Sequence, residues 1–366
     1  MGLTDYYKQF EALTEEEVNA ELREQAAERK RKELAKLDTL DLSHTTWHEL
    51  PDHRVVNAIT YVARRGLHRY PHIRGSELRE VLAERHGVEP GRLILGNGAT
   101  ELLNAATRAV LGPGEQLLTA WPSYPLYPLM ARRAHGRAVP VSGGVDALLA
   151  AAQEDGVRVV VLASPNDPTG ELVAAADLAR LLDGVPKGVA VLLDEALVDF
   201  ADAQPADSSL RLLETHPELI VFRTFSKAWG LAGLRVGYAI GGPGSEELLA
   251  QLEPDLGVSE VSQAGAFEAL RRCTEVVAHR ARTIAQERER VTDGLRARGF
   301  DVADSQANFV WAAHPTLDGG ELADQLARAG ILVAAGHALG EPHHVRISLR
   351  SRPASERLLR AVDSGS

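Results

Sequence analysis

The sequence predicts an α/β protein with two domains: a larger one built on a mostly parallel sheet with helices on both faces, and a smaller α/β one. The chain has 366 residues, more than a single hydrophobic core usually serves. Apolar runs at residues 157–163 and 189–193 flank a helical pattern at 174–182, an order typical of parallel sheets. After residue 300, short strands alternate with helices. We expect three segments: an N-terminal helical arm that contributes to the small domain (1–55), the large domain (56–262), and a linking helix with the small domain (263–366).

The composition excludes several classes of protein. The formal net charge is −11 and the pI is about 5.7, which disfavours nucleic acid or an anionic membrane as a partner. The single cysteine, Cys273, rules out an internal disulfide and a cysteine metal cluster. The first ten residues lack the apolar core of a signal peptide, and no apolar run reaches membrane-spanning length. We therefore expect a soluble cytoplasmic protein.

The N-terminal part is polar and charged. Residues 14–36 are rich in Glu, Arg, Lys and Ala, and Thr14 with Glu17 fits a capping box, so we expect a solvated, ion-paired helix. The alternative is an arm that lies on a partner subunit. A short strand near residue 40 then leads into a polar loop at residues 44–47.

A glycine turn connects the next strand to a helix. The strand at residues 92–95 runs into Gly96-Asn97-Gly98-Ala99-Thr100, and a helix is expected at 101–111. Exposed amides and the helix N-terminus together form an anion-binding site, here through Ala99 and Thr100. The alternative is simply a tight corner. The third glycine of a dinucleotide fingerprint is missing.

An aromatic segment, Trp121-Pro122-Ser123-Tyr124-Pro125-Leu126-Tyr127, follows a strand at residues 116–120. A planar ligand ring needs an aromatic face on which to stack, and this segment offers three aromatic side chains. We expect Trp121 and Tyr127 to take part only in ordinary packing.

An acidic residue ends the strand at residues 189–193. A carboxylate at the end of a buried strand is unfavourable unless it is paired with a cation, so Asp194 is expected to face one. The alternatives are a helix cap and a structural ion pair.

A lysine lies on a loop between two apolar runs, residues 219–222 and 234–240. Desolvation beside apolar surface favours the neutral, nucleophilic amine of Lys227. Ser226 adds a hydroxyl and Arg235 a guanidinium, and the three groups together suit an aldehyde that carries a phosphate. The alternative is a solvated lysine on a surface loop.

The segment from Ser226-Lys227-Ala228 to Gly237-Tyr238 resembles the cofactor-lysine segment of fold-type I pyridoxal-phosphate (PLP) aminotransferases, and within them it is most similar to the histidinol-phosphate aminotransferase-like branch. The resemblance implies the PLP-dependent transferase fold type I and a homodimer with sites at its interface. It makes Lys227 the Schiff-base lysine and Asp194 the partner of the pyridine nitrogen. The implied phosphate ligands are Ala99, Thr100, Thr224, Ser226, Arg235 and, from the neighbouring subunit, Tyr70. Tyr124 would stack on the ring.

Two positions depart from the pattern of this family. Asp167 stands where an asparagine usually donates to the 3′-oxygen of the cofactor, and Leu197 stands where a tyrosine usually does. Because both usual donors are absent, we expect a more basic Schiff base than is usual in the family. Asp167 could act in its protonated form at the cofactor, or Asn166 could take over the contact.

A strand near the C-terminus carries an arginine between apolar residues. Arg346 is expected to face an anion, because a guanidinium is rarely buried unpaired. The resemblance makes Arg346 the clamp for the substrate α-carboxylate and places Asn308 near that carboxylate. The alternative for Arg346 is an internal ion pair with a nearby Asp or Glu.

These residues predict a PLP-dependent aminotransferase that moves an amino group between an amino acid and a 2-oxo acid, with Lys227 shuttling a proton as general base and acid. The first alternative is a decarboxylase or lyase on the same fold, similar to threonine-phosphate decarboxylases. The second is a non-catalytic PLP-binding protein. The substrate is not readable, although Ala334-Ala335, where relatives often have an arginine, disfavours histidinol phosphate.

Overall fold

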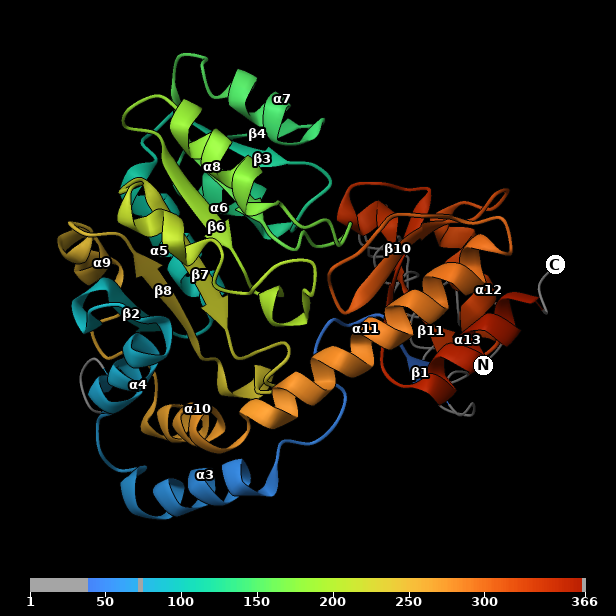
Figure 1. Ribbon diagram of the computed structural model, residues 1–366, viewed down its shortest axis with the longest axis horizontal. Coiled ribbons are helices and arrows are strands. Elements are labelled where there is room, and N and C mark those ends of the chain that lie inside the picture. The colour runs from blue at the N-terminus through green and yellow to red at the C-terminus, as the bar shows by residue number, and fades with distance from the viewer. Residues whose placement is uncertain (1–38, 72–74, 364–366) are drawn as a thin grey trace, which may run out of the picture.

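Two α/β domains make up the protein in a computed structural model that describes residues 39–71 and 75–363. Figure 1 shows the larger domain around a central sheet and the smaller domain, in orange and red, at the far end of the long helix α11 (Thr274–Arg296). The helix expected at residues 14–36 lies outside the described residues. Within the described residues, no helix combines the length and apolar character needed to cross a bilayer.

The large domain is built on a seven-stranded, mostly parallel sheet, as expected. Its order is β2-β8-β7-β6-β5-β3-β4, and β8 alone runs antiparallel to its two neighbours. The strands are β2 (Leu93–Gly96), β3 (Gln116–Ala120), β4 (Arg137–Val141), β5 (Val157–Ala163), β6 (Ala190–Asp194), β7 (Leu219–Thr224) and β8 (Gly237–Gly241). Because β5, β6 and β7 are parallel neighbours, the loops that follow them meet at one edge of the sheet.

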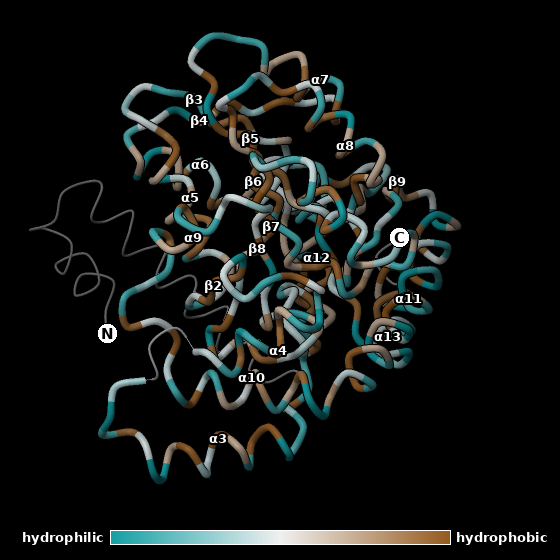
Figure 2. The backbone as a smooth tube through the Cα atoms, turned by 60° about the vertical axis from the view of Figure 1, so that its left-hand side comes forward, coloured by the Kyte–Doolittle hydropathy of each residue, from teal (hydrophilic) through white to brown (hydrophobic). Residues whose placement is uncertain are grey.

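Both faces of this sheet are covered by helices. Val159 and Val161 of β5 belong to one apolar cluster, and Val160 and Leu162 belong to another, as the alternation of side chains along a strand requires. The first cluster includes residues of α5 (Ala99–Val110), α6 (Leu126–Arg133) and α9 (Glu246–Leu252); the second includes residues of α7 (Gly144–Ala151) and α8 (Ala175–Gly184). Figure 2 shows the hydrophobic residues gathered along the central strands.

The helical region after residue 260 is divided in two. We expected one long helix from about residue 261 to 298, but α10 (Glu260–Arg272) and α11 are separate helices with a break at Cys273. α10 packs against α3 (His53–Gly66) and α4 (Ser76–His86) in the large domain. The domain boundary expected at residue 262 falls inside α10, and the division of the chain into domains stays a prediction.

The small domain joins distant parts of the chain. Its main sheet has the order β12-β13-β10-β9, and a second, two-stranded parallel sheet pairs β1 with β11. The strands are β1 (Leu40–Asp41), β9 (Asp301–Val302), β10 (Phe309–Ala313), β11 (Ile331–Leu332), β12 (Ala334–Ala335) and β13 (His344–Ser348). The helices α12 (Gly319–Arg328) and α13 (Arg352–Asp363) complete the domain. The single strand expected at 331–334 is thus divided between two sheets.

Candidate active site

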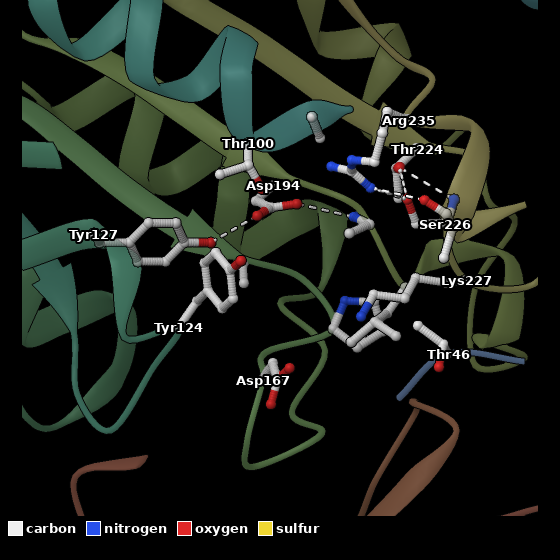
Figure 3. A pocket seen from close by; sticks show the side chains of 16 residues that line it. Thr46, Thr100, Tyr124, Tyr127, Asp167, Asp194, Thr224, Ser226, Lys227 and Arg235 are labelled. Carbon is white, nitrogen blue, oxygen red and sulfur yellow. Dashed lines mark hydrogen bonds between the residues drawn. The ribbon is translucent and has the colours of Figure 1, made fainter. Parts of the chain in front are cut away.

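A cavity lies where the loops after β5, β6 and β7 meet the N-terminus of α5 (Figure 3). It has a volume of about 180 Å³. Most of the residues expected to bind the cofactor line it, although they come from five separate stretches of sequence: Ala99, Thr100, Tyr124, Asp167, Asp194, Thr224, Ser226, Lys227 and Arg235. A cavity at the carboxyl ends of parallel strands is the usual ligand site of such a sheet.

Lys227 extends into this cavity from the loop after β7. Its neighbours Phe225 and Ala228 are buried in the core and anchor the loop on both sides of the lysine. Burial lowers the pKa of the Lys227 amine, although Asp167 opposes the shift, so the neutral form is favoured. Nζ donates a hydrogen bond to the hydroxyl of Thr45, a residue of the polar loop that follows β1.

An anion-binding cradle lies beside the lysine. The Thr224 hydroxyl donates to Ser226 Oγ over 3.0 Å, and Arg235 Nη1 donates to the same oxygen over 3.3 Å. Arg235 adopts a left-handed backbone conformation with φ 52°. This conformation is unusual for residues other than glycine, and it occurs mainly at active sites and ligand-binding positions. The N–H groups of Ala99 and Thr100 open α5 and have no acceptor within the helix, and Gly98 provides no side-chain cap for them. Two hydroxyls, a guanidinium and free amides suit a phosphate.

Gly98 makes this cradle possible. Its φ is +88°, and a Cβ atom there would collide with the guanidinium of Arg235. The glycine turn is therefore required both for the start of α5 and for the approach of Arg235.

Asp194 ends β6 inside the cavity and is buried without a cation. Tyr127 donates its hydroxyl proton to Oδ2 over 2.9 Å, and the amide of Ala196 donates to Oδ1 over 3.0 Å. Burial raises the pKa of Asp194, and these two hydrogen bonds only partly oppose the shift. Within the described residues no ion pair forms at Asp194, so the carboxylate can accept a cationic N–H from a ligand.

The aromatic segment contributes two tyrosines rather than one. The ring of Tyr124 lines the cavity and meets Tyr127 edge-on, with centroids 5.5 Å apart. We expected Tyr127 only to pack; this was wrong, because its fully buried hydroxyl holds Asp194 (Figure 3). The sequence gave a hint, since a buried tyrosine hydroxyl usually needs a partner.

The two residues expected to bind the substrate carboxylate lie just behind the cavity wall. Arg346 of β13 forms an ion pair with Asp167, and its Nη2 donates to the carbonyl of Ser43 over 3.0 Å. Asn308 donates to the carbonyl of Thr45 over 2.9 Å, and its Oδ1 is buried with no partner among the described residues. The alternative weighed for Arg346, an internal ion pair, is thus present in this state, and the carboxylate clamp stays a prediction.

The polar loop after β1 is the part of the site that sequence reasoning missed. Ser43 and Thr45 contact Arg346, Asn308 and Lys227, and Thr46 lines the cavity. No local signal could have identified this loop, because its partners lie far away in the sequence and in both domains.

The remaining expectations have mixed outcomes. Asn166 is bonded to Ser123, Pro122 and Thr169, so its side chain is engaged away from the cavity. Leu197 lines the cavity and provides no hydrogen-bond donor there. Tyr70 is 81% exposed and outside the cavity of its own chain, so its role toward a neighbouring subunit stays a prediction.

Known proteins share both this sequence pattern and this fold. A profile of the family described as "Aminotransferase class I and II" matches residues 32–364. The chain belongs to this family. A histidinol-phosphate aminotransferase from Anaeromyxobacter sp. is 36% identical over 303 residues, which cover 81% of this aminotransferase and 82% of the relative. An aromatic amino acid aminotransferase from Streptomyces coelicolor is 37% identical over 263 residues, covering 70% and 72%.

Solved structures confirm the fold of this aminotransferase. The histidinol-phosphate aminotransferase from Sinorhizobium meliloti, in complex with pyridoxal 5'-phosphate, superposes with a TM-score of 0.81 at 25% identity, over 93% of this chain and 95% of that one. The enzyme from Clostridium acetobutylicum gives a TM-score of 0.80 at 22% identity and supports the fold alone. This chain is therefore a fold-type I aminotransferase with PLP as its cofactor.

The cavity fits this cofactor. The cradle matches the phosphate of the cofactor, and the half-buried amine of Lys227 matches its aldehyde. The carboxylate of Asp194, which has no ion-pair partner among the described residues, matches the ring nitrogen.

Proposed function

We propose that Lys227 binds the cofactor covalently and that Asp194, Tyr124 and the cradle hold its ring and phosphate. The observation that carries this proposal is the convergence of Lys227, Asp194 and the cradle on one cavity (Figure 3). Pyridoxal phosphate supplies an aldehyde for the donor's amine and a ring that accepts electrons while its nitrogen is protonated. Asp194 keeps that nitrogen protonated, because a buried carboxylate stabilises an adjacent N–H cation.

Lys227 also moves the proton in this proposal. When it is not bound to the cofactor, the Nζ of Lys227 would act as the base that takes the proton from the donor's α-carbon. Burial holds the pKa of this amine below its ordinary value, and a lowered pKa favours the neutral base. Thr45, whose hydroxyl accepts from Nζ, would keep the free amine pointed into the cavity.

We further propose that the amino donor has an uncharged side chain, as the aromatic amino acids named for the Streptomyces relative do. The cations lining the described cavity are Lys227 and Arg235, both committed to the cofactor. A donor with its own phosphate, as named for the Anaeromyxobacter relative, would therefore lack a second cation on this lining.

The proposal is tested by covalent trapping and a donor screen. Borohydride treatment of the holoenzyme should fix the cofactor to the peptide that contains Lys227, and Lys227→Arg, which keeps the charge, should not be labelled. Aromatic amino acids paired with 2-oxoglutarate or pyruvate should give a higher kcat/KM than histidinol phosphate. Labelling of another residue would contradict the role of Lys227, and release of carbon dioxide in place of the 2-oxo acid product would contradict transamination. A preference for histidinol phosphate would contradict the proposed donor class.

We also propose that the active form is a homodimer in which Tyr70 binds the cofactor phosphate of the neighbouring subunit. The exposure of Tyr70 supports this role, since an exposed tyrosine outside its own cavity is free to contact a second chain.

A further inference from the structure

Both terminal nitrogens of Arg346 are engaged before any substrate arrives, while its buried Nε has no hydrogen-bond partner among the described residues. Its Nη1 is paired with the Asp167 carboxylate and its Nη2 donates to the carbonyl of Ser43. The two charged side chains are shielded, with 11% of the Arg346 side chain and 13% of the Asp167 side chain exposed. The ion pair therefore lies in a partly desolvated place, where charge interactions are stronger than in water.

The pair also joins the two domains. Asp167 lies on the loop after β5 in the large domain, and Arg346 lies on β13 in the small domain. Asp167 lines the cavity (Figure 3), whereas Arg346 is not part of the lining, so a ligand in the cavity reaches the carboxylate of the pair first.

The arrangement of charged side chains in the site determines which cation is available to bind a substrate carboxylate. Arg235 belongs to the phosphate cradle, and Asp194 faces the place of the ring nitrogen. The cations that line the described cavity, Lys227 and Arg235, are both assigned to the cofactor. Arg346, which contacts the lining residue Asp167, has no assigned role at the cofactor, and Asp167 already neutralises its charge.

We propose that Asp167 is a specificity-determining residue: a built-in carboxylate that competes with the substrate's carboxylate for Arg346. The proposal rests on the proposed function, and it concerns how this aminotransferase distinguishes donors with a carboxylate from donors without one. A substrate carboxylate must displace Asp167 or share one guanidinium with it, and two carboxylates at one cation repel each other. A donor or acceptor without the carboxylate does not disturb the pair. Asp167 therefore weakens the binding of α-carboxylates to Arg346. As a result, the affinity for amino acids exceeds the affinity for simple amines and amino alcohols by less than it would without Asp167.

Asparagine at position 167 isolates the charge. Its side chain has the same shape, and its Oδ1 can still accept the hydrogen bond from Arg346 Nη1. Asp167→Asn should therefore leave the guanidinium in place and remove only the competing charge. The effect on binding should be large, because charges in close contact interact strongly.

The test is calorimetric titration of the holoenzyme with hydrocinnamate and with hydrocinnamyl alcohol, which share the ring and chain and differ in the carboxylate. We expect Asp167→Asn to bind hydrocinnamate about tenfold more tightly than the parent does, with no change for the alcohol. Asp167→Glu, which keeps the charge, should remain as weak as the parent. Weaker or unchanged hydrocinnamate binding in Asp167→Asn, an equal change for both ligands, or an equal gain in Asp167→Glu would overturn the proposal.

Two more variants control the experiment. Asp202→Asn removes the carboxylate from another arginine pair, with Arg288 at 2.8 Å, at a distance from the cavity, and it should change neither affinity. Arg346→Gln should abolish the gain that Asp167→Asn produces, and a gain that persists without Arg346 would contradict the competition. Borohydride labelling of Lys227 is measured on the same samples, so a failure of the proposed function is recognised by lost labelling and a failure of this inference by unchanged ligand binding.

Discussion

Two adjacent buried carboxylates show how one residue's surroundings separate a ligand site from a structural ion pair. Asp194 receives hydrogen bonds from a tyrosine and an amide, whereas Glu195, the residue that follows β6, pairs with a guanidinium, with Arg223 Nη2 at 2.8 Å. Burial raises the pKa of both groups, and for Glu195 the neighbouring Arg223 opposes the shift. The charge that Asp194 lacks is the one that the cofactor nitrogen would provide.

This contrast predicts opposite effects of two isosteric substitutions. The pKa of Asp194 is raised above its ordinary value near 3.8, so its contribution to apo-protein stability is full below that pH and is lost as the pH rises through the raised pKa. At pH 7.5, Asp194→Asn should therefore leave the apo-protein at least as stable as the parent while cofactor affinity falls strongly. Glu195→Gln should lose about 3 kcal/mol of unfolding free energy, because it breaks a buried ion pair.

Urea unfolding of the apo-proteins and spectroscopic titration with pyridoxal phosphate check both expectations. Retained cofactor binding in Asp194→Asn, or a strongly destabilised apo form, would show that Asp194 has a structural role instead. Glu195→Gln serves as the matched variant, since it should still bind the cofactor.

At the scale of one element, the N-terminus of α5 is the proposed anion site, and the backbone rather than a side chain sets its geometry. Gly98 precedes the helix with φ +88°, and its missing Cβ leaves room for the Arg235 guanidinium. An element can bind phosphate in this way because its first N–H groups point toward the ligand and carry partial positive charge.

We predict that Gly98→Ala weakens phosphate and cofactor binding about tenfold, because alanine at this backbone conformation is strained by about 1–3 kcal/mol and displaces Arg235. Gly233→Ala is the matched control: the residue lies in the cofactor segment, and an added Cβ meets no atom within 4 Å. Inorganic phosphate should raise the melting temperature of the apo parent and of Gly233→Ala but not of Gly98→Ala. Equal protection of all three proteins would contradict the role of the turn.

At the scale of the whole molecule, the site is assembled by both domains. The large domain provides the cavity, while β13 and β10 of the small domain bring Arg346 and Asn308 against the loop after β1. Lys227, in turn, donates to Thr45 of that loop. A change in how the domains pack would therefore move Arg346 and Asn308, the residues proposed to bind the substrate carboxylate, before it moves the residues proposed to bind the cofactor.

The proposed homodimer makes a prediction at this scale. Tyr70→Phe and Lys227→Ala should each be nearly inactive as pure proteins, but subunits mixed under dissociating conditions and reassembled should recover about a quarter of the parent activity, since half of the dimers are hybrids with one intact site. Recovery is measured by the donor assay after size-exclusion chromatography. No recovery from well-formed hybrids would show that Tyr70 does not act across the interface, and Tyr61→Phe, another exposed tyrosine, provides the control.

The sequence alone predicted the parts of this protein that short stretches encode. The strands at residues 116–120 and 157–163 have their expected bounds, and Lys227 and Asp194 lie together as the parallel order of β6 and β7 requires. Apolar runs, glycine turns and strand–loop–helix order are local, so they can be read without knowing what packs against them. The resemblance then named the cofactor that the family and the cavity support.

Only the tertiary structure decided which side chains complete the site. Lys227 and Thr45 are 182 residues apart in the chain, and Arg346 and Asp167 are 179 apart. Such contacts depend on how two domains meet, and no local pattern contains that information. For the same reason the sequence suggested only packing for Tyr127, a residue of α6 whose hydroxyl reaches Asp194 at the end of β6. Burial makes an unpaired polar group unfavourable there and so fixes the partnership.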